Sequence, residues 1–461
     1  MGQMAYCKEC FEKQKVIDYL QDELKRVKAL VRYQERTAKE GVFGSSTPSS
    51  KKPFKTNANE ETRGKRGGAV AGHTGHGRKS FDKSEADKVL ETNLLEICPD
   101  CGGKIIQCRN GKKSRTVVDI KPVKSEKIYY DVSSGKCKKC GRIYRGKIPG
   151  VLPKSLFGNE LISHIAVQHY IYGITLGKLE SQFGIGTGSM VNILHRLSKI
   201  FKDIPDKLIQ DYQQSFVKHA DETGWRNDGC SGYGWLFCNE KNSIFRFRNT
   251  RSSKVPMEIF GNAKLPGRLI VDRYNGYNKL PVILQYCYAH LLRTLEDIEK
   301  DFPDIVEIRQ FVSTLAPLLS QAMRLRSQKI PDKEFYKEAK FIKKKILESI
   351  DSQANHPSIQ QFQDIFRNNE SRMYHWCGDR RVPADNNMAE RDLRSTVIAR
   401  KVSFGSQSDE GAKTREILMT ILYTLKKRCD NYAARFKSVL DAFANNPNSN
   451  LYELLFALQK K

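Results

Sequence analysis

The spacing of apolar residues predicts a helix over residues 11–40. The apolar positions recur in alternating steps of three and four, which is the heptad pattern of an amphipathic helix. They are Ile17, Leu20, Leu24, Val27 and Val31. The pattern is typical both of one helix packed on its own domain and of a short coiled coil that pairs two protomers.

Apolar periodicity is absent after this helix, so residues 41–90 are expected to form a basic flexible linker. Over most of the stretch, Gly, Ser, Thr and Lys replace the large apolar residues. The segment 63–78 combines Arg and Lys with several Gly. It suits equally a segment that follows a DNA backbone and a solvated tether.

Helical spacing returns over residues 155–203. Three helices are expected, at 161–172, 176–183 and 189–201, and a Gly-rich turn at 184–188 separates the last two. This order fits a helix-turn-helix. An ordinary helical hairpin has the same pattern, and both interpretations stay open.

Residues 214–300 change to short apolar runs typical of strands, so the expected fold class is α/β. The run 269–271 is wholly apolar, as a buried central strand would be. A helix is expected over 252–260 and another from about His290. The expected strands are 216–220, 233–238, 244–248, 269–271 and 285–288.

The rest of the chain has a helical pattern. Residues 303–370 are polar and free of strand signals, and a last helical block covers about 387–427. That block is interrupted near 404–411.

Charge points to a polyanionic partner. The chain has 461 residues, enough for several domains at roughly 100–200 residues each. Its 79 Lys+Arg against 52 Asp+Glu give a formal net charge of +27, an excess that most often indicates DNA or RNA. Charge supplies affinity through counterion release, but neither sequence preference nor chemistry.

The chain is expected in the cytoplasm, without a membrane partner. Its start has no apolar stretch of signal-peptide length, and no run approaches the roughly 18–20 apolar residues of a membrane span. In that compartment the 12 cysteines are expected as thiols or metal ligands. Cys7 and Cys10 form a pair by themselves, which suits plain thiols or a site shared between protomers.

Two further cysteine pairs predict a structural zinc site. Cys98 with Cys101, and Cys137 with Cys140, each enclose two residues and precede a Gly. This spacing lets both sulfurs of a pair reach one ion, and the Gly frees the tight turn. Four thiolates leave no open position on Zn²⁺, so a structural rather than catalytic metal is expected.

Residues 91–150 are therefore expected to form a zinc-ribbon-like domain. Short strands are expected within it at 116–120 and 127–131. The loop between the two cysteine pairs is longer than in an ordinary zinc finger, so the ribbon has an enlarged loop.

Three acidic residues are candidates for a catalytic site. Asp221 follows the run 216–220, Asp272 follows the run 269–271, and Glu390 lies at the start of the last helical block. Neighbouring strand ends and one helix can gather three carboxylates, which repel one another unless cations lie between them. Oxygen ligands with open water positions select Mg²⁺ or Mn²⁺. Two such ions ~3.5–4 Å apart activate a water or a 3′-hydroxyl and stabilise the leaving oxygen.

Simpler roles are open to the same three residues. Asp221 and Asp272 suit the beginning of turns after strands. Glu390 has capping-box spacing from Asn387 and suits a helix cap.

Two neighbouring acids are excluded from the set by direction. A strand points Glu222 away from residue 221. A helix turns Asp392 about 200° away from residue 390.

The chain resembles the transposases of the insertion sequence 66 family through several motifs that occur in a fixed order. They are Asp-Glu-Thr-Gly-Trp at 221–225, Val-Asp-Arg-Tyr-Asn-Gly-Tyr at 271–277, Cys-Tyr-Ala-His at 287–290, Asn-Asn-Met-Ala-Glu-Arg at 386–391 and Arg-Lys-Val-Ser-Phe-Gly-Ser at 400–406. The resemblance extends from the cysteine pairs to about residue 430. It implies a ribonuclease H-like catalytic core whose Asp-Asp-Glu triad is Asp221, Asp272 and Glu390.

The resemblance also implies a domain order. The expected parts are an N-terminal helix or short coiled coil (1–40), the linker (41–90), the zinc-binding domain (91–150), a helix-turn-helix-like region (151–205), the catalytic domain (206–302 and 380–430), a helical insertion (303–379) and a C-terminal tail (431–461).

The implied function is that of a DNA transposase. It would bind the ends of an insertion sequence, hydrolyse phosphodiesters with two Mg²⁺ (or Mn²⁺) ions per active site, and join the 3′-hydroxyl to target DNA. The implied partners are double-stranded DNA of the terminal inverted repeats and the target, further protomers in a homodimer or larger assembly, and accessory proteins encoded by the element. Such a protein is expected in the cytoplasm, associated with the nucleoid.

Other residues near the triad have candidate roles beside simpler ones. Cationic side chains available to neutralise phosphates are Arg391, Arg394, Arg400 and Lys401. A solvated helix face or an ion pair between Arg394 and Glu390 would explain them equally. Cys287 and His290 match a Cys-x-x-His signature of related transposases, with an accessory role or core packing beside the site as alternatives.

Two other functions are compatible with these residues. One is a ribonuclease H-like nuclease that cleaves without joining, since the metal site would be shared. The other is a catalytically inactive zinc DNA-binding regulator.

Overall fold

The computed structural model describes residues 8–40, 83–85, 89, 99–105, 123–136, 138–140 and 142–457. The chain divides into two compact units. One comprises Met1–Pro53 with Lys127–Lys461, and the other is Phe54–Glu126. The predicted linker therefore lies almost wholly outside the described residues, with only a short 3₁₀ turn, η3 (Lys83–Glu85), and residue 89 described.

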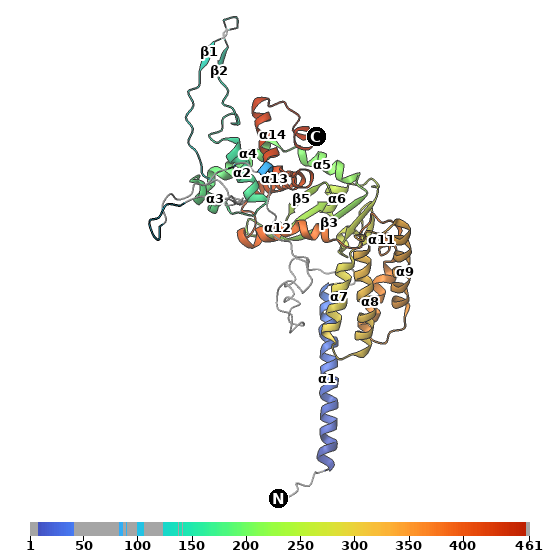
Figure 1. Cartoon of the computed structure of the whole chain (residues 1–461). Coiled ribbons are helices and arrows are strands. Elements are labelled where there is room, and N and C mark those ends of the chain that lie inside the picture. Colours follow the sequence, from blue (N-terminus) through green and yellow to red (C-terminus); the bar gives the residue numbers. More distant parts are fainter. Residues whose placement is uncertain are drawn as a thin grey trace. The chain divides into compact units, whose positions relative to one another are not determined.

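A five-stranded mixed sheet forms the centre of the first unit (Figure 1). Its strands lie in the order β5-β4-β3-β6-β7. Strands β5, β4 and β3 are antiparallel to one another, whereas β6 and β7 run parallel to β3. Each expected strand between 214 and 300 is present, so the α/β class is confirmed. The strands are β3 (Val217–Asn227), β4 (Cys230–Cys238), β5 (Ser243–Arg248), β6 (Arg268–Val271) and β7 (Ile283–Tyr286).

Strand β3 is longer than its apolar run predicted. The run ends at Ala220, but the strand continues through Asp221 to Asn227. The reason is unequal pairing. β4 pairs with β3 as far as Asn227, whereas the named pairs with β6 end at His219 and Ile270. Asp221 therefore lies inside a strand but at the rim of the parallel part of the sheet.

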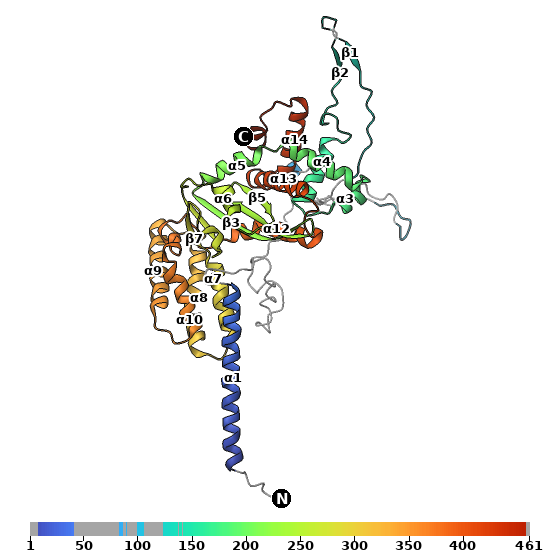
Figure 2. The same cartoon turned by 180° about the vertical axis from the view of Figure 1, so that it is seen from behind.

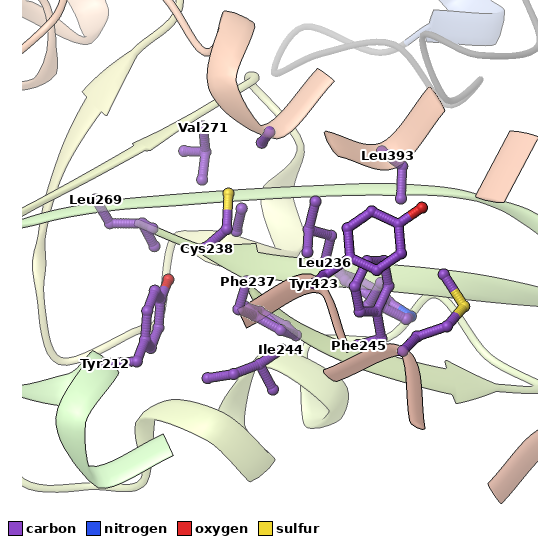
Figure 3. Packing of buried hydrophobic residues seen from close by; sticks show 14 of the residues in the cluster. Tyr212, Leu236, Phe237, Cys238, Ile244, Phe245, Leu269, Val271, Leu393 and Tyr423 are labelled. Carbon is purple, nitrogen blue, oxygen red and sulfur yellow. The ribbon is translucent and has the colours of Figure 1, made fainter. Parts of the chain in front are cut away.

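Helices cover both faces of the sheet. α12 (Asn387–Ser403) lies against the face of β3 and β4 that includes Asp221, and α5 (Ile204–Gln213) and α6 (Lys254–Phe260) lie near the other face. The ring of Phe260 is 6.1 Å from that of Phe237 in β4, edge to face. Figure 3 shows the core that results around these strands.

The outer edge of β5 is closed by side chains of α13 (Asp409–Arg428). The amides of Ser243 and Phe245 donate to the hydroxyls of Thr424 and Thr420, at 3.1 and 3.0 Å, and Phe247 donates to Glu416 at 3.4 Å. Four residues of a helix rise about 6 Å, and two residues of a strand rise about 6.6 Å. Acceptors that are four residues apart on α13 therefore match the outward-facing amides of β5, which are two residues apart. An edge that would otherwise expose unpaired amides is covered.

The helical region before the sheet packs on α13. It contains α2 (Asn159–Tyr170), α3 (Leu176–Phe183) and α4 (Thr187–Ile200), close to the three expected helices. α3 ends at Gly184, whose φ of 66° is a left-handed conformation that favours glycine. α4 buries Met190 and Leu197 against this core.

The C-terminal segment, expected as a tail, is largely helical. α14 (Tyr432–Asn445) packs on α2 and α13, and α15 (Leu451–Phe456) follows it. The side chains of Phe436 and Leu440 are fully buried, so the segment contributes to the core.

The chain between β7 and α12 is helical (Figure 2). Its four long helices are α7 (Tyr288–Asp301), α8 (Val306–Leu325), α9 (Asp332–Asp351) and α10 (Pro357–Asn368). Short helical turns occur at η4 (Asn275–Tyr277), η5 (Glu370–Arg372) and α11 (His375–Gly378).

The first helix, α1 (Lys8–Glu40), has the predicted span, and its heptad seam is exposed. The exposed fractions of Ile17, Leu20, Leu24, Val27 and Val31 lie between 45% and 57%. Among the described residues, no helix is both long and apolar enough to cross a bilayer.

The strand expected at 127–131 is absent, and that prediction was wrong. These residues are exposed and belong to no strand. A β-hairpin forms next to them instead, between β1 (Ser134–Lys136) and β2 (Ile143–Arg145). Cys140 lies in a turn between these strands, and the turn of a hairpin sets which residues pair. The other expected strand, 116–120, lies outside the described residues.

Candidate active site

Three predicted carboxylates are positioned by the sheet and α12. Asp221 is 3% exposed within β3, and Asp272 is 8% exposed and follows β6 directly. Since His219 is in register with Ile270, continuing both strands by two residues brings Asp272 beside Asp221 on the same face. Glu390 lies in the first turn of α12, the helix on that face.

The acids interact electrostatically. Burial raises the pKa of Asp221 well above its usual range, and the charges of Glu222, Asp272 and Glu390 raise it further. Burial and the charge of Glu222 raise the pKa of Asp272 to about 7. The three predicted carboxylates are therefore close enough for Asp272 and Glu390 to act on the buried carboxylate of Asp221.

Backbone amides orient the two aspartates. The amide of Glu222 donates to Oδ1 of Asp221, and the amide of Tyr274 donates to Oδ1 of Asp272, both at 2.9 Å. These bonds favour the charged carboxylates, but burial outweighs them.

The two excluded acids have partners of their own. Glu222 binds the guanidinium of Arg251 at 2.6 Å and accepts a hydrogen bond from the hydroxyl of Tyr277. Asp392 binds Lys427 at 2.6 Å. Alternation along β3 places Glu222 on the opposite face from Asp221, as predicted, yet its charge still acts on both aspartates.

Asn386 connects the start of α12 to β3 and to α7. Its Oδ1 lies 2.8 Å from Nδ1 of His219, and its Nδ2 donates to the carbonyl of Ala220 at 2.8 Å. Its backbone amide donates to Sγ of Cys287 at 3.1 Å. We call these contacts the Asn386 latch. They hold the first turn of α12, and therefore Glu390, next to the strand that carries Asp221.

The carboxylate of Glu390 faces α7. Its Oε2 accepts from Arg293 at 2.8 Å, and its Oε1 lies 3.7 Å from Nδ1 of His290. The N-cap of α12 makes no side-chain cap bond, so the capping-box role of Glu390 is not adopted. The expected alternative pairing with Arg394 is replaced by the pair with Arg293.

Cys287 and His290 lie beside Glu390. One ligand atom from each, together with one from Glu390, lie within 4.8 Å of one another, a spacing that could hold a metal ion. Cys287 is fully buried, and burial raises the pKa of its thiol to about 12. Its Sγ also accepts a hydrogen bond from the backbone amide of Asn386 at 3.1 Å.

The four predicted phosphate-neutralising residues lie along α12. Arg391, Arg394 and Lys401 are exposed, whereas Arg400 is half-buried. Nε of Arg400 is buried and has no hydrogen-bond partner within the described part of the chain.

The predicted zinc ligands are only partly described. Cys101 and Cys140 are exposed thiols in turns. Cys98 and Cys137 lie outside the described residues, so the zinc site stays a prediction from spacing. Cys7 also lies outside them.

Sequence reasoning missed the residues that support the acids. Asn386 and Tyr277 stand inside motifs already quoted, but nothing in the letters separates buried Asn386 from exposed Asn387. Arg293 follows His290 by three residues on a helix, which places both on one face. This spacing is the sequence signal that could have identified Arg293 as a neighbour of His290. Arg251 comes from a loop, and no sequence signal marks it.

Comparison with known proteins identifies a class, namely transposases. A family model described as "Transposase IS66 family" matches residues 154–414, more than half of the chain. The chain belongs to this family, as its motifs implied.

Two relatives come from Sinorhizobium fredii (strain NBRC 101917 / NGR234). "Uncharacterized protein y4jD" is 22% identical over 233 residues, which cover 46% of this chain and 42% of that protein. "Uncharacterized protein y4hP" is 20% identical over 408 residues, which cover 78% and 72%. The match therefore spans less than half the length of the first relative.

Proposed function

We propose that this protein is a DNA transposase that hydrolyses and transfers phosphodiesters at Asp221, Asp272 and Glu390. The observation that carries the proposal is that the charges of Asp272 and Glu390 both act on the buried carboxylate of Asp221, although the three residues come from two strands and a helix far apart in sequence. Membership of the IS66 family supports the same conclusion.

The topology of the sheet supports a ribonuclease H-like core. An antiparallel meander of three strands is followed by two strands parallel to the first, in the order β5-β4-β3-β6-β7. Asp221 lies on β3, the first strand of the sheet in chain order, and Asp272 follows β6, the fourth. These positions fit an Asp-Asp-Glu arrangement. The helices between β7 and α12 then form an insertion into this core.

The donor set fits divalent cations. Oε1 of Glu390 is buried and has no hydrogen-bond partner among the described residues, and burial raises the pKa of the neighbouring aspartates Asp221 and Asp272. Hard oxygen donors of this kind suit Mg²⁺ or Mn²⁺. When bound, two such ions supply an activated water or 3′-hydroxyl and stabilise the leaving oxygen.

The chain's own residues position and shield the reaction. The Asn386 latch holds Glu390 near β3, and Arg293 balances part of its charge. Arg391 and Arg394 are exposed on the same helix and available to DNA phosphates. In the proposed sequence, water attacks the phosphodiester at the element end and a 3′-hydroxyl leaves. That hydroxyl then attacks a target phosphodiester and displaces a second 3′-hydroxyl, without a covalent protein intermediate.

Strand transfer with DNA that contains the element end tests the proposal. Asp272→Asn should lower cleavage and joining in Mg²⁺ by roughly 10²–10³-fold, the loss typical of removing one electrostatic transition-state stabiliser. Asp392→Asn removes a neighbouring carboxylate outside the triad and serves as the control. Cleaved ends that are never joined would favour the nuclease alternative. DNA-dependent activities that do not change in Asp272→Asn would favour the inactive regulator.

A further inference from the structure

One face of α12 is exposed and combines cations with apolar residues. We call it the α12 stripe, which consists of Arg391, Arg394, Ile398, Lys401 and Val402. At 3.6 residues per turn these side chains fall within about 100° of arc, next to the direction of Glu390. Ile398 and Val402 are 56% and 47% exposed, although apolar helix positions usually face a core.

The stripe ends at an exposed aromatic residue in a strained conformation. Phe404 follows α12 directly, and 71% of it is exposed. Its φ of 60° lies in the left-handed region, which bulky residues rarely adopt. Such a conformation costs about 1–3 kcal/mol and persists only where the surroundings impose it.

The surroundings that impose it come from the end of β3. The amide of Ser406 donates to the carbonyl of Arg226 at 2.9 Å, and the carbonyl of Ser406 accepts from the amide of Asp228 at 2.9 Å. The indole of buried Trp225 donates to the hydroxyl of Ser406 at 3.1 Å.

Gly405 completes this clamp. Its φ is 136°, and a Cβ there would lie 2.1 Å from the carbonyl oxygen of Arg226. The turn is therefore fixed to the strand that carries Asp221, and the ring of Phe404 is held outward.

Neither the exposure nor the strain of Phe404 benefits folding. A glycine would adopt this φ without strain, and an exposed ring gains little from burial. The ring is therefore best explained by contact with a partner. The exposed cations of the stripe and the formal charge of +27 favour a polyanion over another protein surface.

We propose that the α12 stripe binds DNA next to the cleaved bond and that Phe404 stacks on, or inserts between, its bases. This inference rests on the proposed function. The helix extends about 20 Å from Glu390 to Phe404, or about six base-pair steps. Arg391 and Arg394 would bind phosphates near the acids, and Phe404 would unstack a step farther along. Apolar wedges that unstack bases are a known means of holding bent DNA.

The experiment compares binding of two short duplexes of equal sequence, one fully paired and one with a single mismatch. Binding is measured in EDTA, so catalysis plays no part. A mismatch lowers the cost of unstacking, so the wild-type protein should prefer the mismatched duplex by about tenfold, the size of one base–aromatic stacking contact. 2-Aminopurine beside the mismatch reports the stacking directly.

Three variants separate the contributions. Phe404→Gly relieves the strained φ, so it should fold at least as stably as the wild type while losing the preference and the 2-aminopurine response. Phe404→Trp should retain both. Arg394→Gln should weaken binding to both duplexes alike and reduce the salt dependence by about one phosphate contact. Phe341→Ala removes another exposed aromatic, on α9, and is the matched control.

The outcomes are distinguishable. A Phe404→Gly protein that keeps the mismatch preference overturns the inference but leaves the transposase proposal intact. The inference is also overturned if Phe404→Gly changes the oligomeric state without DNA, because the ring would then contact a second copy. Failure of the wild type to bind either duplex would contradict the DNA-binding function itself.

Discussion

Asp272 acquires its unusual proton affinity from its position at the end of a buried strand. The side chain is only 8% exposed and lies in the field of Glu222. A nearby arginine, Arg251, lowers its pKa but is already paired with Glu222. The same position that prepares a carboxylate for a cation therefore makes it hold a proton when no cation is bound.

Without divalent metal, folding stability should decrease as the pH rises. The pKa of Asp272 is about 7 in the folded state and roughly 3.9 in an unfolded chain. The stabilising contribution of its proton is therefore complete below about pH 4, declines as the pH rises from about 4 to about 7, and is lost above that range. Asp221, whose pKa is also raised, acts in the same direction.

The measurement is the midpoint of thermal unfolding in EDTA across this pH range. Asp272→Asn should flatten the decline, because its amide does not ionise. Adding Mg²⁺ at high pH should restore stability to the wild type more than to the variant. If the unfolding midpoints of the wild type and of Asp272→Asn changed with pH in the same way, ionisation of Asp272 would not be the cause of the decline.

Two adjacent asparagines show what the sequence could predict and what it could not. The motif at 386–391 indicated Glu390, whose charge acts on Asp221 in the structure, but the sequence alone does not distinguish Asn386 from Asn387. Burial and three partners distinguish Asn386, and those partners come from β3 and α7. Contacts that depend on how distant segments meet are not encoded in local spacing.

Asn386→Ala should misplace Glu390. Loss of the latch leaves the carbonyl of Ala220 and the ring of His219 without this partner, and a shift of about 1 Å at a catalytic group costs roughly 10²-fold in rate. The rate of strand transfer is the readout, with the Mg²⁺ concentration at half-maximal rate measured in parallel. Asn387→Ala at the exposed neighbouring position is the control, and equal losses in both variants would refute a specific role for the latch.

At the scale of elements, apolar runs predicted where strands occur more reliably than they predicted how long the strands are. The runs 233–238, 244–248 and 269–271 each became a strand with similar limits, because buried strands need apolar side chains. β3 continued beyond its apolar run because pairing with β4 supports polar residues such as Asp221 and Thr223. The strand at 127–131 was predicted wrongly because β propensity does not provide a pairing partner.

The edge contact between β5 and α13 gives a test at this scale. Thr420→Val keeps the shape of the side chain but leaves the amide of Phe245 without an acceptor, which should cost about 1–3 kcal/mol of unfolding free energy. Thr396→Val is the matched control, because the hydroxyl of Thr396 is buried without a partner within the described residues. That substitution should be neutral or stabilising. Denaturant unfolding measures both, and equal effects would refute the role of the edge contact.

At the scale of the whole molecule, α1 is the segment most suited to pairing protomers. Its apolar seam is about half exposed along its length, although an isolated helix gains nothing from such a seam. The sequence left self-packing and a coiled coil open, and the exposure favours the coiled coil.

Leu24→Glu should therefore weaken self-association. A charge in the seam must be desolvated when two helices pair, so the dissociation constant of the dimer should rise by about tenfold or more. Analytical ultracentrifugation measures it. Tyr19→Glu places the same charge on α1 outside the seam and should have little effect. A wild-type protein that remains monomeric at all concentrations would exclude this mode of pairing.

The closed margin of β5 has a consequence for assembly. Its outward amides are already satisfied by two hydroxyls and a carboxylate, so no foreign strand can be added there without first displacing a helix. This blocks the commonest route by which sheets stack into fibrils.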